Sequence, residues 1–185
     1  MSADGTKLSA TVYNGKIWNS VDSGSVWTEV TSVPSKYYYG VCMSHDGMTR
    51  FAAVNQGKFW KSTNSGGNWS EIASSTVKPW FGLACSGDAT ILAATDWSGT
   101  GRIWISTDSG SNWAEKTNAP ITDWYGIAMS SDGTKLSATV ENGNIWSSTD
   151  SGATWTENTA SPGAVQQWYG MAMSDDGTKR IASTN

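Results

Sequence analysis

The sequence predicts an all-β protein: a β-propeller of four-stranded antiparallel blades, about 43 residues per blade, with incomplete terminal blades. Three observations predict this fold. An eight-residue box recurs four times, an aromatic-aromatic-glycine step recurs at the same interval, and turn residues divide each repeat into four short runs. Such recurrence indicates a repeated structural unit rather than a motif that marks one catalytic centre.

The period of the repeat is set by tryptophans. The boxes read "SVDSGSVW", "STNSGGNW", "STDSGSNW" and "STDSGATW", and their last residues lie 42, 44 and 42 positions apart. Residues 1–29 and 129–157 are identical at 22 of 29 positions, so the units are near-copies. We therefore expect a single repeat domain over 1–185, with units at about 1–36, 37–78, 79–122 and 123–166 and a partial unit at 167–185.

Each unit is expected to hold four strands. The runs "QWYGMAMSDDG", "KLSATVENG", "NIWSSTDSG" and "TWTENTASP" are rich in β-branched and aromatic residues and too short for helices. They are separated by Asp-Gly, Asn-Gly, Gln-Gly or Ser-Gly, which tolerate the positive φ angles of tight hairpins. Four antiparallel strands in a unit of this length are typical of a propeller blade.

The aromatic-aromatic-glycine step begins each later unit. We expect its first aromatic residue to be packed between neighbouring blades, because inner strands are buried on both faces; a role as a ligand platform is the alternative. These first aromatic residues are Tyr38, Trp80, Trp124 and Trp168.

The recurring box has the chemistry of a tight turn. The carboxylates of Asp22, Asp108 and Asp150 can accept hydrogen bonds from backbone amides of their own turn, and the glycine two residues later permits the reversal. Asn64 replaces Asp in the second box, a change that a hydrogen-bonding role tolerates better than a calcium site does. We therefore expect structural turns, covered by buried tryptophans, and neither a metal nor a cofactor.

The pattern Ser-x-Asp-x-Gly-x-x-Trp resembles the Asp-box, or sialidase-type (BNR-like), repeat of certain β-propeller families. The resemblance implies a turn between the third and fourth strands of a blade, away from any substrate site, in glycosidases, lectin-like modules and sorting receptors alike. The residues that carry it are Ser20, Asp22, Gly24, Trp27, Ser62, Asn64, Gly66, Trp69, Ser106, Asp108, Gly110, Trp113, Ser148, Asp150, Gly152 and Trp155.

A few residues depart from the period and are candidates for function. Trp97 lies in "DWSGTG", where the third unit carries a two-residue insertion. A tryptophan on an exposed loop is a candidate contact for a sugar or a protein, and folding back on its own blade is the alternative. Asp96 and Glu141 complete the candidate ligand contacts, and Asp123 and Asp175 are the other acids outside the period.

The sequence does not favour an enzyme. Sialidase chemistry needs three arginines that converge from first strands, and Arg50, Arg102 and Arg180 do not occupy such positions. The alternative is a fragment of a sialidase-like glycoside hydrolase, whose two carboxylates would come from the four acids outside the period.

Composition narrows the partners. The net charge is −4 and the 12 basic residues are scattered, which argues against nucleic acid. No apolar run reaches the roughly 18 residues of a membrane span, and residues 1–20 lack the pattern of a signal peptide. Cys42, Cys85 and His45 do not make a zinc site; two free buried thiols are expected, and a disulfide between neighbouring units stays open.

We therefore expect a non-catalytic scaffold for adhesion, glycan binding or self-assembly. The resemblance and the composition favour an extracellular or cell-surface location, with glycans, surface proteins or copies of the chain itself as partners. Residues 1–13 align with 173–185, so the terminal strand of one copy is expected to complete the first blade of the next, head to tail. A longer array, in which the next unit of the same chain fills that place, is the alternative.

Overall fold

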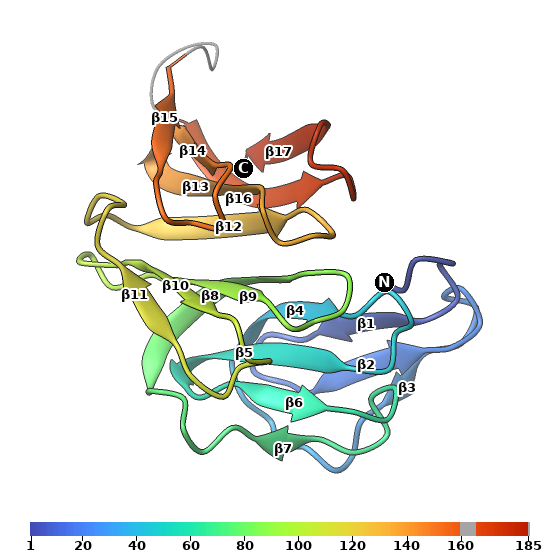
Figure 1. Cartoon of the computed structure of the whole chain (residues 1–185). Helices are drawn as coiled ribbons and strands as arrows, with labels where there is room; N and C mark the ends of the chain where they lie inside the picture. Colours follow the sequence, from blue (N-terminus) through green and yellow to red (C-terminus); the bar gives the residue numbers. More distant parts are fainter. Residues whose placement is uncertain (160–165, 185) are drawn as a thin grey trace.

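A computed structural model of the chain describes residues 1–159 and 166–184 (Figure 1). Seventeen strands, and no helix, form within these residues. The strands fall into five units, numbered in chain order. No helix in the described part of the chain is long and apolar enough to cross a membrane.

Unit 1 contains β1 (Leu8–Thr11), β2 (Ile17–Ser20) and β3 (Thr28–Glu29). Unit 2 contains β4 (Tyr38–Met43), β5 (Arg50–Gly57), β6 (Trp60–Ser62) and β7 (Ser70–Glu71). Unit 3 contains β8 (Lys78–Cys85), β9 (Leu92–Asp96), β10 (Ile103–Ser106) and β11 (Ala114–Lys116). Unit 4 contains β12 (Trp124–Met129), β13 (Leu136–Gly143), β14 (Ile145–Ser148) and β15 (Thr156–Asn158). Unit 5 contains β16 (Gln166–Met173) and β17 (Arg180–Thr184).

Within each unit, every strand pairs with the next one in antiparallel fashion. Units 2, 3 and 4 thus have the four-stranded pattern expected from the turn residues. The last residues of β5 also pair with the start of β8, and those of β13 with the start of β16, so that units 2 and 3, and units 4 and 5, share a sheet. Among the described residues no sheet closes on itself.

The first strands β4, β8, β12 and β16 lie in a row, each in contact with the next (Figure 1). In each of them the aromatic-aromatic-glycine step forms a bulge, where the pairing with the second strand shifts register. The glycine is needed there because the neighbouring first strand passes close by: a Cβ on Gly82 would lie 2.5 Å from the carbonyl oxygen of Tyr125. The sequence step therefore sets the spacing between units.

Thr95 forms hydrogen bonds to both first strands at the close approach between units 3 and 4. Its hydroxyl accepts a hydrogen bond from the amide of Gly82, at 2.7 Å, and donates one to the carbonyl of Tyr125, at 2.6 Å. The side chain is fully buried. One threonine thus holds the bulge of its own unit and the first strand of the next.

The first aromatic residues of the steps fill the space between units. Tyr38, Trp80 and Trp124 are at most 2% exposed, which confirms that these three belong to the core. Trp168 is only partly buried, and its indole nitrogen donates a hydrogen bond to the carbonyl of Gly143 at 3.0 Å. Its lower burial corrects the expectation that all four are equivalent, since no further unit covers it among the described residues.

The box tryptophans pack backwards, against the preceding unit. Trp113 of unit 3 stacks on Phe59 of unit 2 with ring centroids 4.4 Å apart, and Trp155 of unit 4 joins the cluster that contains Ile103 and Ile105 of unit 3. Trp27 is 39% exposed, because the described residues include no unit before unit 1. The expectation that every box tryptophan is buried is therefore wrong for Trp27.

A ladder of backbone hydrogen bonds joins five equivalent turns, which precede β1, β5, β9, β13 and β17. The amide of Ala3 donates to the carbonyl of His45 at 2.8 Å, and that of His45 donates to the carbonyl of Gly87 at 2.7 Å. The ladder continues from Gly87 to Ser131 at 2.7 Å and from Ser131 to Asp175 at 2.8 Å. Equivalent turns of successive units are thus hydrogen-bonded to each other.

The two cysteines lie on neighbouring first strands, Cys42 on β4 and Cys85 on β8, and both are free. Burial, and then the neighbouring thiol of Cys85, raise the pKa of Cys42 well above its usual value. The expectation of free thiols is therefore met, but the two thiols lie next to each other across the boundary between units.

Candidate functional site

The four boxes form the same hydrogen-bonded turn between the last two strands of units 1 to 4. In the fourth box the Ser148 hydroxyl accepts a hydrogen bond from the amide of Gly152 at 2.9 Å and donates one to Asp150 at 2.7 Å. The same Asp150 oxygen accepts a second hydrogen bond, from the amide of Thr154 at 2.8 Å. In the second box Asn64 takes the place of the carboxylate, at 2.9 Å from the Ser62 hydroxyl. The turn therefore requires an acceptor oxygen but no charge.

These hydrogen bonds stabilise the ionised carboxylates. The amide and side chain of Asn112, and then the Ser106 hydroxyl, lower the pKa of Asp108 to about 2. The Thr154 hydroxyl and amide, and then the Ser148 hydroxyl, lower that of Asp150 to about 2. A folded-state pKa below the unfolded value stabilises the fold at higher pH, and this stabilisation is lost as pH falls through the folded pKa.

As the pH falls from about 4 to about 2, the unfolded chain takes up protons at these carboxylates before the folded protein does, so acid is expected to destabilise the protein over this range. Thermal unfolding followed at a series of pH values measures this. In Asp108→Asn/Asp150→Asn, which copies the second box, the fall in melting temperature over this range should be shallower. If the double variant loses melting temperature as steeply as the parent, the box carboxylates do not contribute to acid sensitivity.

The boxes are not expected to bind calcium. Among the described residues no group of three or more His, Cys, Asp or Glu side chains could hold a metal ion. We expect Asn64→Asp to change the free energy of unfolding by less than about 1 kcal/mol and to leave the melting temperature insensitive to calcium. A melting temperature that rises with calcium and falls with a chelator would identify the boxes as metal sites.

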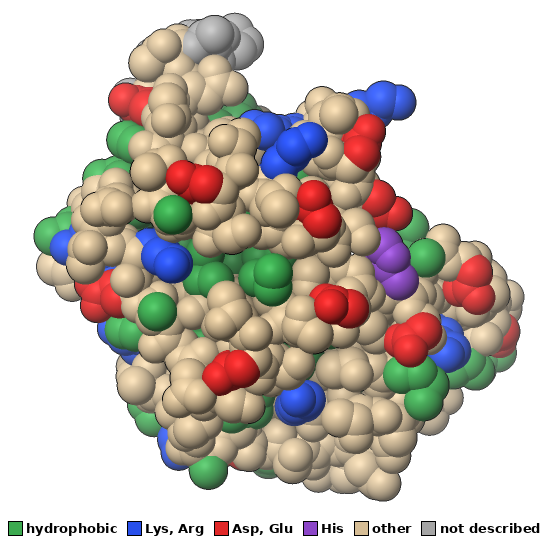
Figure 2. Space-filling model, viewed as in Figure 1, with side chains coloured by type: hydrophobic (Ala, Val, Ile, Leu, Met, Phe, Trp, Pro, Cys, Tyr) green, Lys and Arg blue, Asp and Glu red, His purple; other side chains and the backbone are tan. Residues whose placement is uncertain are grey.

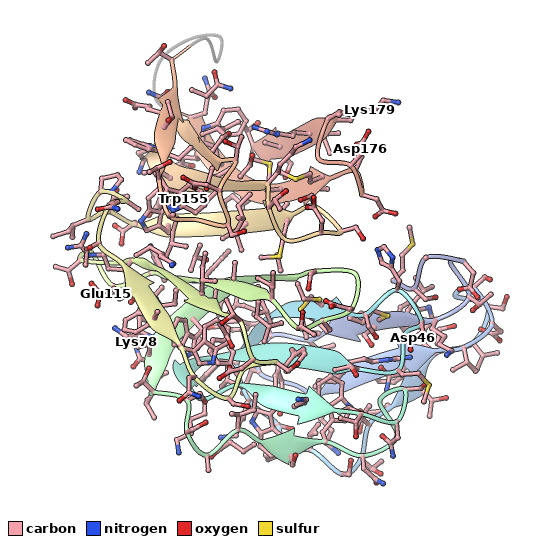
Figure 3. All side chains as sticks on the ribbon, viewed as in Figure 1. Asp46, Lys78, Glu115, Trp155, Asp176 and Lys179 are labelled. Atoms are coloured by element: carbon pink, nitrogen blue, oxygen red, sulfur yellow. The ribbon has the colours of Figure 1, made fainter. Side chains whose placement is uncertain are left out.

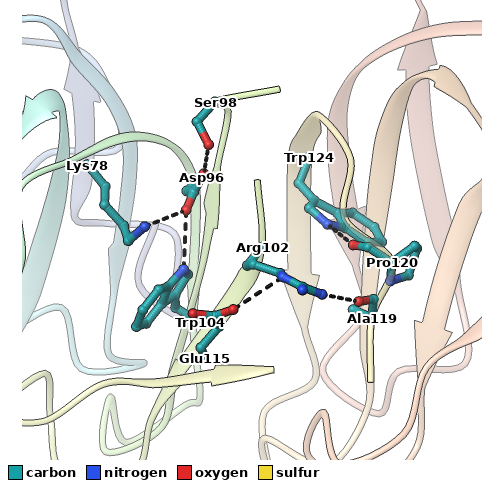
Figure 4. Close-up of polar contacts among 9 residues, drawn as sticks. All are labelled: Lys78, Asp96, Ser98, Arg102, Trp104, Glu115, Ala119, Pro120 and Trp124. Carbon is teal, nitrogen blue, oxygen red and sulfur yellow. Dashed lines mark hydrogen bonds and ion pairs between the residues drawn. The ribbon is translucent and has the colours of Figure 1, made fainter. Parts of the chain in front are cut away.

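The candidate contact Asp96 is buried, at 1% exposure, in the position that Val12, Val54 and Val140 occupy in other units. Its carboxylate lies 3.1 Å from the ammonium of Lys78 and accepts the indole nitrogen of Trp104 at 3.3 Å (Figure 4). The lysine also lies over the Trp104 ring, 4.8 Å from its centroid. The carboxylate is thus fully engaged within unit 3, so we interpret Asp96 as a support for the loop that follows it.

The loop after Asp96 carries Trp97 and holds it against Glu141, which lies on β13 of unit 4. Ser98 donates a hydrogen bond to Asp96 at 2.7 Å, and the amide of Gly99 donates one to the carboxylate of Asp123 at 2.6 Å. The Trp97 indole nitrogen lies 3.2 Å from a carboxylate oxygen of Glu141, on the neighbouring unit. Trp97 stays 38% exposed. The structure therefore brings Trp97 and Glu141 together at an accessible place. The loop itself is held by Asp96 of its own unit and by Asp123 of the next.

The side chains of the other charged residues singled out from the sequence form their contacts away from Trp97. Asp175 forms an ion pair with His45, 3.4 Å apart, at the surface where the single histidine is visible in Figure 2. Arg102 contacts Glu115 at 3.2 Å and the carbonyl of Ala119 at 2.9 Å (Figure 4). The fully buried Arg50 donates to Ser9 and Asn19 of unit 1, each at 2.8 Å.

The structure adds an aromatic surface that the sequence reasoning missed. The second aromatic residues of the steps lie ring beside ring, with centroids 4.7 Å apart from Tyr39 to Phe81, 4.4 Å from Phe81 to Tyr125 and 5.4 Å from Tyr125 to Tyr169. Trp97 lies 5.7 Å from Tyr125, and Tyr13 lies 5.7 Å from Tyr39. We call this set the aromatic band: Tyr13, Tyr39, Phe81, Trp97, Tyr125 and Tyr169. The recurrence of an aromatic second residue in every step was the available signal.

The chain was compared with known proteins. Neither a protein-family model nor a curated protein matches it. Solved structures do match. The GH74 xyloglucanase from Xanthomonas campestris aligns with a TM-score of 0.77 and 17% identity over 98% of this chain and 34% of that one. YCF48 bound to the D1 peptide aligns with a TM-score of 0.68 and 17% identity over 100% of this chain and 59% of that one.

A chain of a nidogen–laminin complex aligns with a TM-score of 0.73 and 13% identity, over 97% of this chain and 78% of that one. The present chain spans only about a quarter to a third of the two GH74 structures, 26% and 34% of their lengths. These neighbours are β-propeller proteins, and at such identities the likeness shows the fold alone. The chain is an all-β protein whose antiparallel units follow the β-propeller fold.

Proposed function

We propose that the chain is a non-catalytic β-propeller scaffold for recognition, in which each four-stranded unit of about 43 residues is one blade. Its role is adhesion at an extracellular or cell-surface location, with glycans or surface proteins as ligands. The observation that carries the proposal is the aromatic band: Tyr13, Trp97 and Tyr169 are 64%, 38% and 47% exposed. Each of the three contacts a less exposed ring of the band. Exposed aromatic side chains grouped in this way are typical of recognition surfaces.

Two of the four acids outside the period are committed to contacts within the chain. Asp96 is buried in an ion pair with Lys78, and Asp175 pairs with His45 at the turn of unit 5. Asp123 accepts the amide of Gly99, which fixes the loop. A glycosidase needs a carboxylic acid and a second carboxylate that both face the substrate, and of the four acids only Glu141 and Asp123 lie beside the aromatic band. The neighbours include GH74 enzymes as well as YCF48 bound to the D1 peptide and a chain of a nidogen–laminin complex, so a hydrolase fragment is the alternative.

A combined binding and hydrolysis assay tests this proposal. The chain is applied to a glycan array and to extracellular matrix proteins, and in parallel incubated with xyloglucan and sialosides. Saturable binding that Trp97→Ala weakens, without release of sugar, is expected. Hydrolysis that Glu141→Gln or Asp123→Asn abolishes, with folding intact by circular dichroism, would replace the scaffold with an enzyme.

A second candidate function is self-assembly. Among the described residues β1 and β17 each have one unpaired edge, which is a template for another chain. Lys7 and Lys135 each donate to the carbonyl of the next unit's turn, at 2.7 Å from Asp46 and Asp176. Lys179, on the same turn as Asp176 (Figure 3), holds the equivalent position in unit 5. A unit 1 of a second copy, or a further unit of a longer chain, would offer it the same contact.

Light scattering tests the self-assembly. We expect the 185-residue chain to form an oligomer whose mass falls to that of a monomer when residues 167–185 are deleted. An unchanged mass in the truncated protein, checked for folding by circular dichroism, excludes strand donation between copies.

A further inference from the structure

The aromatic band lies beside a groove in the row of first strands. The groove has a volume of about 390 Å³, and its lining includes Tyr39, Phe81 and Tyr169 of the band. The bulge glycines Gly82 and Gly126 also line it. Because glycine has no side chain, the faces of the rings are not screened by neighbours in the same strand. The groove therefore presents aromatic faces from three units to one ligand.

The charge next to these rings is negative and unpaired. Glu141 accepts a hydrogen bond from the neutral indole of Trp97, and Asp123 accepts one from the amide of Gly99. Within residues 1–159 and 166–184 neither carboxylate forms an ion pair, whereas the buried Asp96 pairs with Lys78. The ammonium of Lys78 is thus paired with Asp96 and with neither Glu141 nor Asp123.

Burial is the main cause that raises the pKa of two phenols of the band, and only Tyr125 also has the charge of Glu141 beside it. Burial, and then the charge of Glu141, raise the pKa of Tyr125. Burial, and then Tyr13 and Tyr169, raise that of Tyr39. Both rings therefore stay neutral at physiological pH and keep their electron-rich faces, which attract cations.

An aromatic surface can bind an anionic, a neutral or a cationic ligand. The charges around the band favour one of these three classes. An anionic ligand is repelled by the two carboxylates and by a protein whose net charge is −4. A neutral sugar can stack on the rings but gains nothing from the unpaired charge. A cationic side chain is attracted both by the rings and by the carboxylates, since it can lie over a ring and face a carboxylate at the same time.

We propose that the aromatic band and Glu141 bind a basic segment of a partner protein, with an arginine or lysine side chain over the exposed rings of Trp97 and Tyr169. This rests on the proposed recognition function and names its ligand class. Tyr169, at 47% exposure, and Trp97, at 38%, flank the buried Tyr125 ring and leave faces free for contact. Asp123 adds a second negative charge on the loop side.

Calorimetry with a designed peptide pair tests the charge requirement. The probes are an acetylated peptide of four Gly-Arg repeats and the same peptide with citrulline, which is neutral and keeps nearly the same shape. We expect the arginine peptide to bind, with an affinity that falls as salt rises, and the citrulline peptide to bind at least about fivefold more weakly. Equal affinities for the two peptides would overturn the proposal.

Matched variants test the location. Glu141→Gln keeps an acceptor for the Trp97 indole but removes the charge, and it should lower the affinity for the arginine peptide about fivefold. Tyr169→Leu should weaken it similarly. Glu157→Gln, on β15, removes an exposed carboxylate outside the band and serves as the control. If Glu157→Gln weakens binding as much as Glu141→Gln, the peptide is attracted only by the overall charge, and the proposed site is wrong.

The outcomes of these experiments distinguish failure of the basic-ligand inference from failure of the proposed recognition function. If a neutral oligosaccharide or an uncharged protein surface binds and Trp97→Ala removes that binding, while the arginine peptide does not bind, the recognition function stands and the basic ligand is excluded. If nothing in the peptide, glycan and protein panels binds at millimolar concentration, both proposals fail.

Discussion

Gly82→Ala is expected to destabilise the protein by about 3 kcal/mol or more, as forced overpacking in a core does. The added Cβ would lie 2.5 Å from the carbonyl oxygen of Tyr125 and 2.7 Å from the hydroxyl of Thr95. The first of these atoms is backbone of the neighbouring first strand, so relief requires units 3 and 4 to separate. Denaturant unfolding measures the loss.

Gly170→Ala is the matched control for this change. It stands at the same position of its step in unit 5, but a Cβ there meets only the hydroxyl of Ser183, at 2.9 Å, which can rotate away. We expect a loss below about 1 kcal/mol. Equal losses in the two variants would show that the glycine serves the local bulge and not the approach of the next unit.

Trp155→Ala is expected to cost about 3 to 5 kcal/mol, the usual range for removal of a large core aromatic side chain. Trp155 is 7% exposed and lies within unit 4 (Figure 3), with its ring centroid 6.2 Å from that of Trp124. Its indole nitrogen has no hydrogen-bond partner within the described residues, so the loss is one of packing. Thermal or denaturant unfolding gives the value.

Two variants make this prediction specific. Trp27→Ala removes the equivalent residue of unit 1, which is 39% exposed, and should cost about 1 kcal/mol. Trp155→Phe keeps an aromatic ring against Trp124 and should cost much less than Trp155→Ala. Similar small losses for Trp27→Ala and Trp155→Ala would mean that the box tryptophans do not pack between units.

Local chemistry made much of the fold predictable. The hairpin residues and the 42 to 44-residue interval predict the strands and their grouping, because turns are specified by the few residues that form them. The box carboxylates bond within their own turn, over two to four residues, so their contacts follow from the sequence alone. Burial of Tyr38, Trp80 and Trp124 follows from their place on first strands between two units.

What depends on neighbouring units was harder to predict. Trp27 and Trp168 carry the same motif letters as buried residues, yet their exposure is set by which units flank them. Asp96 was a candidate ligand contact because it is an acid outside the period; its partner Lys78 lies 18 residues away, at the start of the first strand of the same unit. In the aromatic band the second residues of successive steps lie 42 to 44 positions apart, and only the packing of units brings Phe81 beside Tyr125.

The central claim is that consecutive units are joined in register along one row of first strands. Amide hydrogen exchange followed by NMR tests it at the turn ladder, where His45, Gly87 and Ser131 donate to carbonyls of the next unit at 2.7 to 2.8 Å. These amides sit in partly exposed turns, so hydrogen bonding between units is what protects them. We predict exchange far slower than that of the amide of Asp175, for which the described residues offer no such acceptor. Exchange of all four amides at the same fast rate would contradict the packing of the units described above.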